Sequence, residues 1–216
     1  STGSGNITVV TSTALELGNI DSSGNLSFTS SAAITKEAGT ALHAGGGIVN
    51  LSAVGGIGAA ANPIVVDVAG AGSVFANSGA GVVAVASTAP VFTVGGGGAS
   101  FSNTGGGGYY VSATNNMNLN GSANDSFAQF SAGGTLTSNG YNNGSGSGVL
   151  MVANAISFSG APTSVAGALG LIAGGAVDVT SNVIAGSVNV VAGSMNVNGA
   201  DISSTAANFT GTISGN

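Results

Sequence analysis

The sequence predicts an all-β fold, a parallel β-solenoid with about 20 residues per coil, and three observations support this prediction. Short apolar–small–apolar triplets recur about 20 residues apart along the chain. Glycine occupies 40 of the 216 positions. Charged residues make up 4% of the chain, against roughly a quarter in ordinary soluble domains. At this period the chain is expected to form roughly 10–11 coils, in a single domain that covers residues 1–216.

The repeat is clearest at the amino terminus. Residues 5–9 read Gly-Asn-Ile-Thr-Val, and residues 24–28, which lie 19 positions later, read Gly-Asn-Leu-Ser-Phe. Alternation of this kind is typical of a short strand with one buried face. Gly, Asn, Ser and Asp between the triplets fit the corners, since they tolerate turn conformations. Because Asn6 and Asn25 occupy equivalent places, we expect Asn ladders between coils.

Other architectures fit less well. A sandwich or barrel would have longer strands and more charge on its exposed face. A helical protein is disfavoured by the glycine content and by the scarcity of Leu, Glu, Lys and Arg. A disordered chain would be rich in charge and poor in β-branched residues, whereas hydrophobic residues make up 43% here. Two glycine-rich stretches, 95–108 and 139–148, are predicted to be loop insertions at coil corners.

The charge balance excludes two classes of partner. The net charge is −6, and Lys and Arg together supply one residue. A nucleic-acid binder needs several basic residues, and so does a protein that binds an anionic membrane surface. Cysteine is absent, which excludes disulfides and thiolate metal sites. The sequence shows no apolar run of membrane-spanning length and no signal peptide, so we expect a processed or excised piece of a longer precursor.

One segment carries a resemblance to a known family. Residues 46–58 read Gly-Gly-Ile-Val-Asn-Leu-Ser-Ala-Val-Gly-Gly-Ile-Gly, and residues 62–67 read Asn-Pro-Ile-Val-Val-Asp. This phrase resembles the repeat regions of filamentous-haemagglutinin-like bacterial exoproteins, the adhesins of two-partner secretion. The resemblance implies a secreted right-handed β-helix, displayed on a Gram-negative surface and used for adhesion, aggregation or matrix building. Over the rest of the chain it extends only to composition and period.

Polysaccharide-degrading β-helices need carboxylates on neighbouring coils and basic groups that stabilise developing charge. Two pairs of acidic residues have coil-like spacing, Glu16 with Glu37 and Asp178 with Asp201. If stacked about 5 Å apart, either pair could share a proton or hold calcium. The remaining acidic residues are Asp21, Asp67 and Asp125.

The sequence favours a surface role for these charged residues over a catalytic or metal-binding role. Sparse acids at corners keep a surface soluble, and Lys36 beside Glu37 is expected to be a solvated surface pair. His43 has no second His or Cys at metal-ligand spacing, so a corner position is expected rather than a ligand or a base. We therefore predict no catalytic residue, no metal site and no cofactor.

The strand edges of a solenoid favour assembly, because the backbone N–H and C=O groups on the outer side of each outermost coil are unpaired. The candidate edge residues are Ile7 and Val9 near the start, and Phe209 and Ile213 near the finish. Subunits that join head to tail through such edges form a non-closing filament. The expected partners are therefore other copies of the chain, or flanking coils of a longer parent protein.

Three functional classes follow, all with a secreted, extracellular or cell-surface location. The first is a structural subunit or segment of a fibre or surface matrix. The second is an adhesin segment that binds glycans or proteins, with Tyr109, Tyr110, Phe127 and Tyr141 as its candidate contact surface. The third is a polysaccharide lyase or hydrolase, which the shortage of basic residues disfavours.

Overall fold

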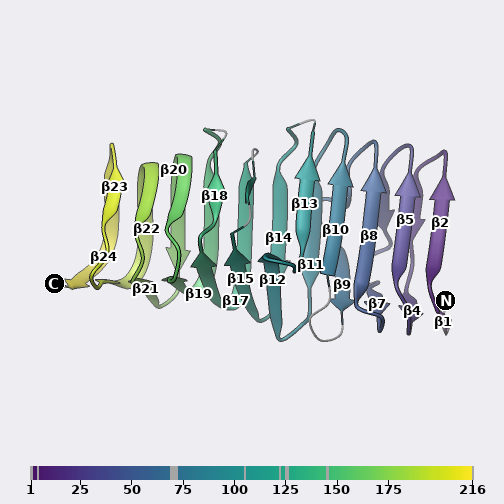
Figure 1. The fold of residues 1–216 in the computed structure, drawn as a ribbon, viewed down its shortest axis with the longest axis horizontal. Coiled ribbons are helices and arrows are strands. Elements are labelled where there is room, and N and C mark those ends of the chain that lie inside the picture. The colour runs from purple at the N-terminus through teal and green to yellow at the C-terminus, as the bar shows by residue number, and fades with distance from the viewer. Residues whose placement is uncertain are drawn as a thin grey trace. The chain divides into compact units, whose positions relative to one another are not determined.

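The computed structural model describes residues 2–3, 5–68, 73–104, 106–121, 123–124, 127–144 and 146–215. Over these residues the protein is all-β, with parallel strands in stacked coils about 20 residues apart (Figure 1). This is a right-handed β-solenoid of about 10 turns, and the predicted fold class is confirmed. The chain groups into two compact units, one of Ser1–Ala89 with Gly97–Ser112 and one of Pro90–Gly96 with Ala113–Asn216. The single domain predicted for residues 1–216 stays a prediction.

The first unit contains a five-stranded parallel sheet, which we call the front sheet because it faces the viewer in Figure 1. Its strands are β2 (Ile7–Thr11), β5 (Leu26–Ser30), β8 (Ile48–Ala53), β10 (Ser73–Ser78) and β13 (Ser100–Asn103). Ile7 pairs with Leu26, Leu26 with Val49, and Val49 with Val74. The predicted equivalence of residues 5–9 and 24–28 is therefore confirmed, while the later coils are several residues longer.

The other strands of the first unit complete its coils. One row consists of β1 (Thr2–Gly3), β4 (Ile20–Ser22), β7 (Leu42–Ala44), β9 (Ile64–Val68) and β11 (Val83–Ser87). On a third side β3 (Leu15–Leu17) pairs with β6 (Ile34–Lys36). β14 (Tyr109–Ala113) ends at the boundary between the units. The stretch 95–108, expected to be a loop, contains β13, and residue 105 lies outside the described residues.

The second unit combines short strands with strands of 9–15 residues. Its strands are β12 (Val91–Gly95), β15 (Asn116–Asn120), β16 (Ala123–Asn124), β17 (Ala128–Asn139), β18 (Asn142–Asn143), β19 (Val149–Phe158), β20 (Thr163–Ala173), β21 (Ala176–Val179), β22 (Val183–Val197), β23 (Ile202–Ser204) and β24 (Ala207–Gly215). Register shifts occur within β17, β20 and β22. β18 lies within the stretch 139–148 that was expected to be a loop, of which residue 145 is outside the described residues.

The core is built from columns of inward side chains, one from each coil. In the second unit one column runs through Met117, Leu136, Ile156, Val177, Met195 and Ile213, each in register with the next. The first four are fully buried, Met195 is 1% exposed, and Ile213 in the last coil is 60% exposed. Each inward residue is therefore covered by the coil on either side of it, and burial of these columns drives the stacking.

Inward serines stabilise the corners where strands end. Ser30 closes β5, and its hydroxyl donates to the carbonyl of Thr13 at 2.7 Å while accepting the amide N–H of Ala32 at 3.0 Å. Ser78 closes β10 in the same way, donating to the carbonyl of Gly55 at 2.6 Å. A corner carbonyl outside the strand ladder thus receives a hydrogen bond from the neighbouring coil.

Asparagines join coils at other corners. The side-chain oxygen Oδ1 of Asn6 accepts the backbone N–H of Asn25 at 2.9 Å. The same contact, from an Asn to a backbone amide one coil further on, recurs at Asn19, Asn116, Asn139 and Asn182. Asparagines therefore do join coils, but through side-chain to backbone hydrogen bonds and not through the predicted ladder of stacked Asn side chains.

Close approach of coils explains many glycines. A Cβ on Gly107 would lie 2.1 Å from the carbonyl oxygen of Gly81, and one on Gly167 would lie 2.3 Å from that of Gly146. Neither position has a left-handed backbone. These glycines are required because backbone of an adjacent coil occupies the space that any side chain would need.

The phrase at residues 46–67 folds into a defined unit. Ile57 is fully buried and bridges to both Ile34 and Val83. Ala59 and Asn62 exchange two backbone hydrogen bonds, of 3.1 and 2.9 Å, which close a tight turn. The side chain of Asn62 then donates from Nδ2 to the carbonyl of Lys36 at 2.9 Å, which ties the turn to the preceding coil.

Candidate functional site

The outward side chains are the groups available for chemistry, because the inward ones fill the core. Strand pairing fixes which outward residues stack, so each predicted pair can be checked directly. Glu16 is in register with Thr35, and not with Glu37. Asp178 is in register with Asn196, whose Nδ2 donates to Asp178 Oδ1 at 2.6 Å, and not with Asp201. Neither of the two carboxylate pairs considered from spacing is in register, because these coils have 19 and 18 residues rather than 21 and 23.

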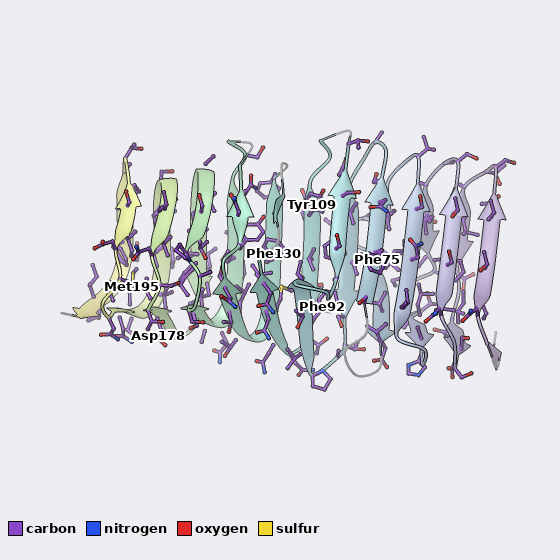
Figure 2. All side chains as sticks on the ribbon, viewed as in Figure 1. Phe75, Phe92, Tyr109, Phe130, Asp178 and Met195 are labelled. Carbon is purple, nitrogen blue, oxygen red and sulfur yellow. The ribbon has the colours of Figure 1, made fainter. Side chains whose placement is uncertain are left out.

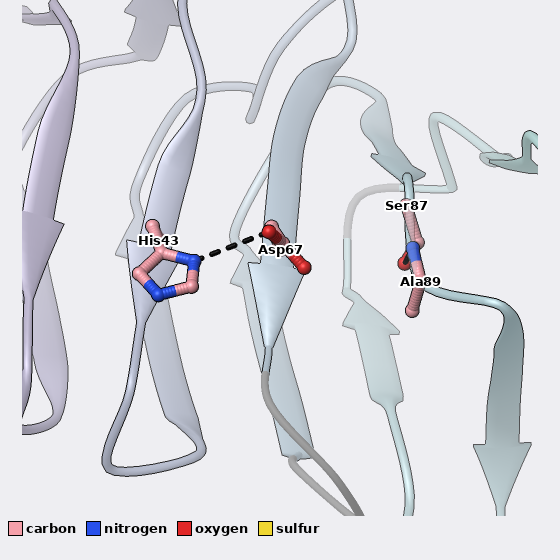
Figure 3. Close-up of polar contacts among 4 residues, drawn as sticks. All are labelled: His43, Asp67, Ser87 and Ala89. Atoms are coloured by element: carbon pink, nitrogen blue, oxygen red, sulfur yellow. Dashed lines mark hydrogen bonds and ion pairs between the residues drawn. The ribbon is translucent and has the colours of Figure 1, made fainter.

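Ionisable side chains do stack on the row formed by β4, β7 and β9. Asp21, His43 and Asp67 occupy successive register positions. His43 Nδ1 lies 3.1 Å from Asp67 Oδ2, as the dashed line in Figure 3 shows, and the two side chains are 45% and 47% exposed. Half-exposed pairs of this kind contribute little to stability. A carboxylate in this position orients the imidazole, which is the geometry that a general base needs.

A nucleophile beside this pair would complete a hydrolytic site. Ser87, on the neighbouring strand β11, is in register with the inward residue Val66 and is 1% exposed. Its hydroxyl accepts the backbone N–H of Ala89 at 3.2 Å, away from His43 (Figure 3). Ser87 is therefore a corner serine, and the His43–Asp67 pair has no serine aligned with it among the described residues.

The one basic residue lies in a different place from that predicted. Lys36 occupies an inward position of β6, in register with Leu17, and is 8% exposed. Its ammonium group donates to the carbonyl of Glu37 at 3.2 Å, whereas the residue Glu37 is exposed. The expectation of a solvated surface pair is wrong for Lys36, since its alkyl chain fills a core position.

Metal ligands do not gather in the part of the chain that the structure describes. Within it, no group of three or more His, Asp and Glu side chains is placed to hold an ion. Asp125, one of the acidic residues considered above, lies outside the described residues. Of the carboxylates considered for stacking, Glu16 lies in register with Thr35 and Asp178 with Asn196.

The predicted aromatic contact surface is largely buried. Tyr141 is fully buried and packs edge-on against Phe130, with ring centroids 5.2 Å apart. Tyr109 is 4% exposed. Burial removes both rings from contact with a ligand, which leaves Tyr110, partly exposed, and Phe127, 38% exposed, from the predicted set.

The candidate edge residues occupy the outermost described coils. Ile7 and Val9 are inward residues of β2, in register with the buried Leu26 and Phe28. Val9 is nevertheless 36% exposed, and Ile213, in register with Met195, is 60% exposed. Phe209 pairs with Val190 and is partly exposed. These side chains occupy inward positions of their strands. They are exposed because no described coil covers them on one side.

The outer face of the front sheet was not predicted as a site. Its outward residues are all uncharged, and they are Thr8, Val10, Ser27, Thr29, Ile48, Asn50, Ser52, Ser73, Phe75, Asn77, Ser100 and Ser102. Phe75 is the one aromatic side chain in this set and is 39% exposed (Figure 2). The alternation in residues 73–78 could have located it, because Val74 and Ala76 take the inward places.

Comparison with known proteins adds no relative. The chain matches no protein-family model, no curated protein and no solved structure. Among the described residues, no helix is long and apolar enough to cross a membrane.

Proposed function

We propose that this chain is a structural β-solenoid segment of a secreted bacterial fibre or surface matrix, of the filamentous-haemagglutinin-like type. The observation that carries the proposal is the exposure of inward side chains in the outermost described coils, 36% at Val9 and 60% at Ile213. A further coil laid on either one would bury apolar surface and extend the parallel sheets. That coil comes from a second copy or from flanking sequence of a longer protein.

The low charge supports the same role. With 4% charged residues, little electrostatic repulsion opposes stacking of one chain on another. The surface location rests on the resemblance of residues 46–67 to filamentous-haemagglutinin-like repeats. A structural rather than catalytic role is supported by the pairing of Glu16 with Thr35 and of Asp178 with Asn196, and by the corner role of Ser87, whose hydroxyl is not directed at His43.

Electron microscopy of the purified chain over a range of concentrations tests the assembly. We expect filaments whose length rises with concentration, as a head-to-tail contact requires. Ile213→Asp places a charge in the edge and should shorten the filaments, because charged residues block edge pairing. Val54→Asp is the matched control, since Val54 is 61% exposed but does not lie in an outermost coil.

Two outcomes contradict the self-assembly. A wild-type chain that stays monomeric at high concentration would show that flanking coils of a parent protein, and not other copies, cover these edges. Filaments unaffected by Ile213→Asp but lost in Val54→Asp would show that the contact is lateral.

A further inference from the structure

We propose that the outer face of the front sheet binds a neutral polysaccharide, with Phe75 as the stacking platform. This ligand site is separate from the edges that carry the assembly proposal, and it does not depend on them. Three features of the first unit support it: an exposed aromatic ring, a surrounding set of hydroxyl and amide groups, and the absence of charge.

The ring of Phe75 stands on an inner strand of the front sheet, next to the edge strand β13. β10 is flanked by β8 and β13, so Phe75 is in register with Asn50 on one side and Ser100 on the other. Along its own strand the outward neighbours are Ser73 and Asn77. Figure 2 looks onto this face and shows Phe75 on β10. A ring so placed offers a flat apolar surface against which the C–H face of a sugar can stack.

The polar neighbours can orient a sugar. The Asn50 side chain is exposed and makes no hydrogen bond with another described residue, so its amide is available as donor and acceptor. Asn77 accepts a hydrogen bond from the hydroxyl of Ser102, which holds that amide in a fixed orientation beside the ring. Ser73 donates to the carbonyl of Gly97 at 2.8 Å and keeps its oxygen as an acceptor.

The charge distribution selects the ligand class. Every charged residue of the first unit lies outside the front sheet: Glu16, Asp21, Lys36, Glu37 and Asp67. Lys36 is buried in β6 and cannot meet a sulfate or carboxylate at this face. A face without charge complements a ligand without charge, and it offers no positive charge to compensate the desolvation of a sulfate or uronate group. Amide and hydroxyl groups around one aromatic ring fit a neutral glycan.

Native affinity electrophoresis of the chain tests this directly. Gels containing dextran, galactomannan, xyloglucan or mixed-linkage β-glucan are compared with a gel containing dextran sulfate. We expect at least one neutral polysaccharide to retard the wild-type chain, and we expect the retardation to be insensitive to added salt. Dextran sulfate should cause none.

Variants separate the proposed face from the rest of the surface. Phe75→Ala should weaken binding about tenfold, as loss of an aromatic stacking surface does, while Phe75→Tyr should retain it. Asn50→Ala should weaken it roughly threefold. Phe127→Ala is the matched control, because Phe127 is 38% exposed and lies in the second unit. Circular dichroism of each variant confirms that it is folded.

Several results would overturn the proposal. These are the absence of retardation by every neutral polysaccharide, equal retardation by dextran sulfate, and wild-type binding by folded Phe75→Ala. Loss of binding in Phe127→Ala alone would place the contact on the second unit instead. Binding that persists in Ile213→Asp would show that the glycan site works whether or not filaments form.

Discussion

Replacing Gly167 with alanine is the sharpest test of how tightly the coils stack. Gly167 lies in β20, between the two residues where the register shifts against β22. A Cβ at this position would lie 2.3 Å from Gly146 O, 2.5 Å from Ser147 O and 2.8 Å from Gly146 C. Ordinary van der Waals contact of a Cβ begins near 3.4 Å, so about 1 Å must be opened between two backbones.

The expected cost follows from these distances. Overpacking costs about 1–3 kcal/mol when side chains can adjust. Here the obstructing atoms are backbone, so we expect Gly167→Ala to lower the free energy of unfolding by about 3 kcal/mol before any compensation. Because the backbone at Gly167 is not left-handed, alanine returns about 0.4–1 kcal/mol by restricting the unfolded chain. The net expected loss is therefore about 2–3 kcal/mol.

Urea denaturation followed by far-UV circular dichroism measures this loss, and Gly170→Ala is its control. Gly170 lies in the same strand, where a Cβ would meet the end of the flexible Leu150 side chain at 3.1 Å. We expect Gly170→Ala to match the wild type within about 0.5 kcal/mol, as surface changes usually do. If Gly167→Ala were as stable as Gly170→Ala, the close-stacking explanation of the glycines would be refuted.

Three further changes test the corners and the core, each by urea denaturation. Asn139→Ala removes the acceptor of the Ala161 N–H and should cost about 1 kcal/mol; no loss would mean that water replaces this contact. Phe130→Ala opens a cavity against Tyr141 and should cost about 3–5 kcal/mol, and a loss below about 1 kcal/mol would contradict its burial. Lys36→Met keeps the packing of the alkyl chain but removes the part-buried hydrogen bond from the ammonium group to the carbonyl of Glu37, and should stay within about 1 kcal/mol of the wild type; a loss above about 2 kcal/mol would show that this hydrogen bond holds the corner.

The fold could be predicted from sequence because two periods overlap in it. Alternation within a triplet indicates a strand, and recurrence about 20 residues later indicates a coil. The register could not be predicted in the same way, since coil length varies from 18 residues between Val177 and Met195 to 26 between Ile57 and Val83. A corner absorbs extra residues without disturbing the core. Spacing alone therefore allowed Asp178 to stack on Asp201, whereas strand pairing places it beside Asn196.

The candidate contact surface was misplaced for a related reason. Tyr109 and Tyr141 adjoin glycine-rich stretches, which suggested exposed loops, but the coils place both rings in the core. The direction of a side chain follows from its phase in a strand, and the phase is clear only where alternation is unbroken. It is unbroken in residues 73–78, where Val74 and Ala76 fix Phe75 as outward. Alternation in residues 73–78 therefore predicts the exposed ring of Phe75, whereas the clustering of aromatic residues along the sequence does not.

The outward residues on two sides of the first unit differ in chemistry, although the same repeating coils form both sides. Every coil must supply inward apolar groups, and that demand is the same on each side. Outward positions carry no such demand, so their chemistry is set independently on each row of strands. The row of β4, β7 and β9 stacks Asp21, His43 and Asp67, while the front sheet carries hydroxyl and amide groups around Phe75 and no charge. A solenoid can therefore extend its core at the coil edges and bind a ligand on one face, since the two tasks use different residues.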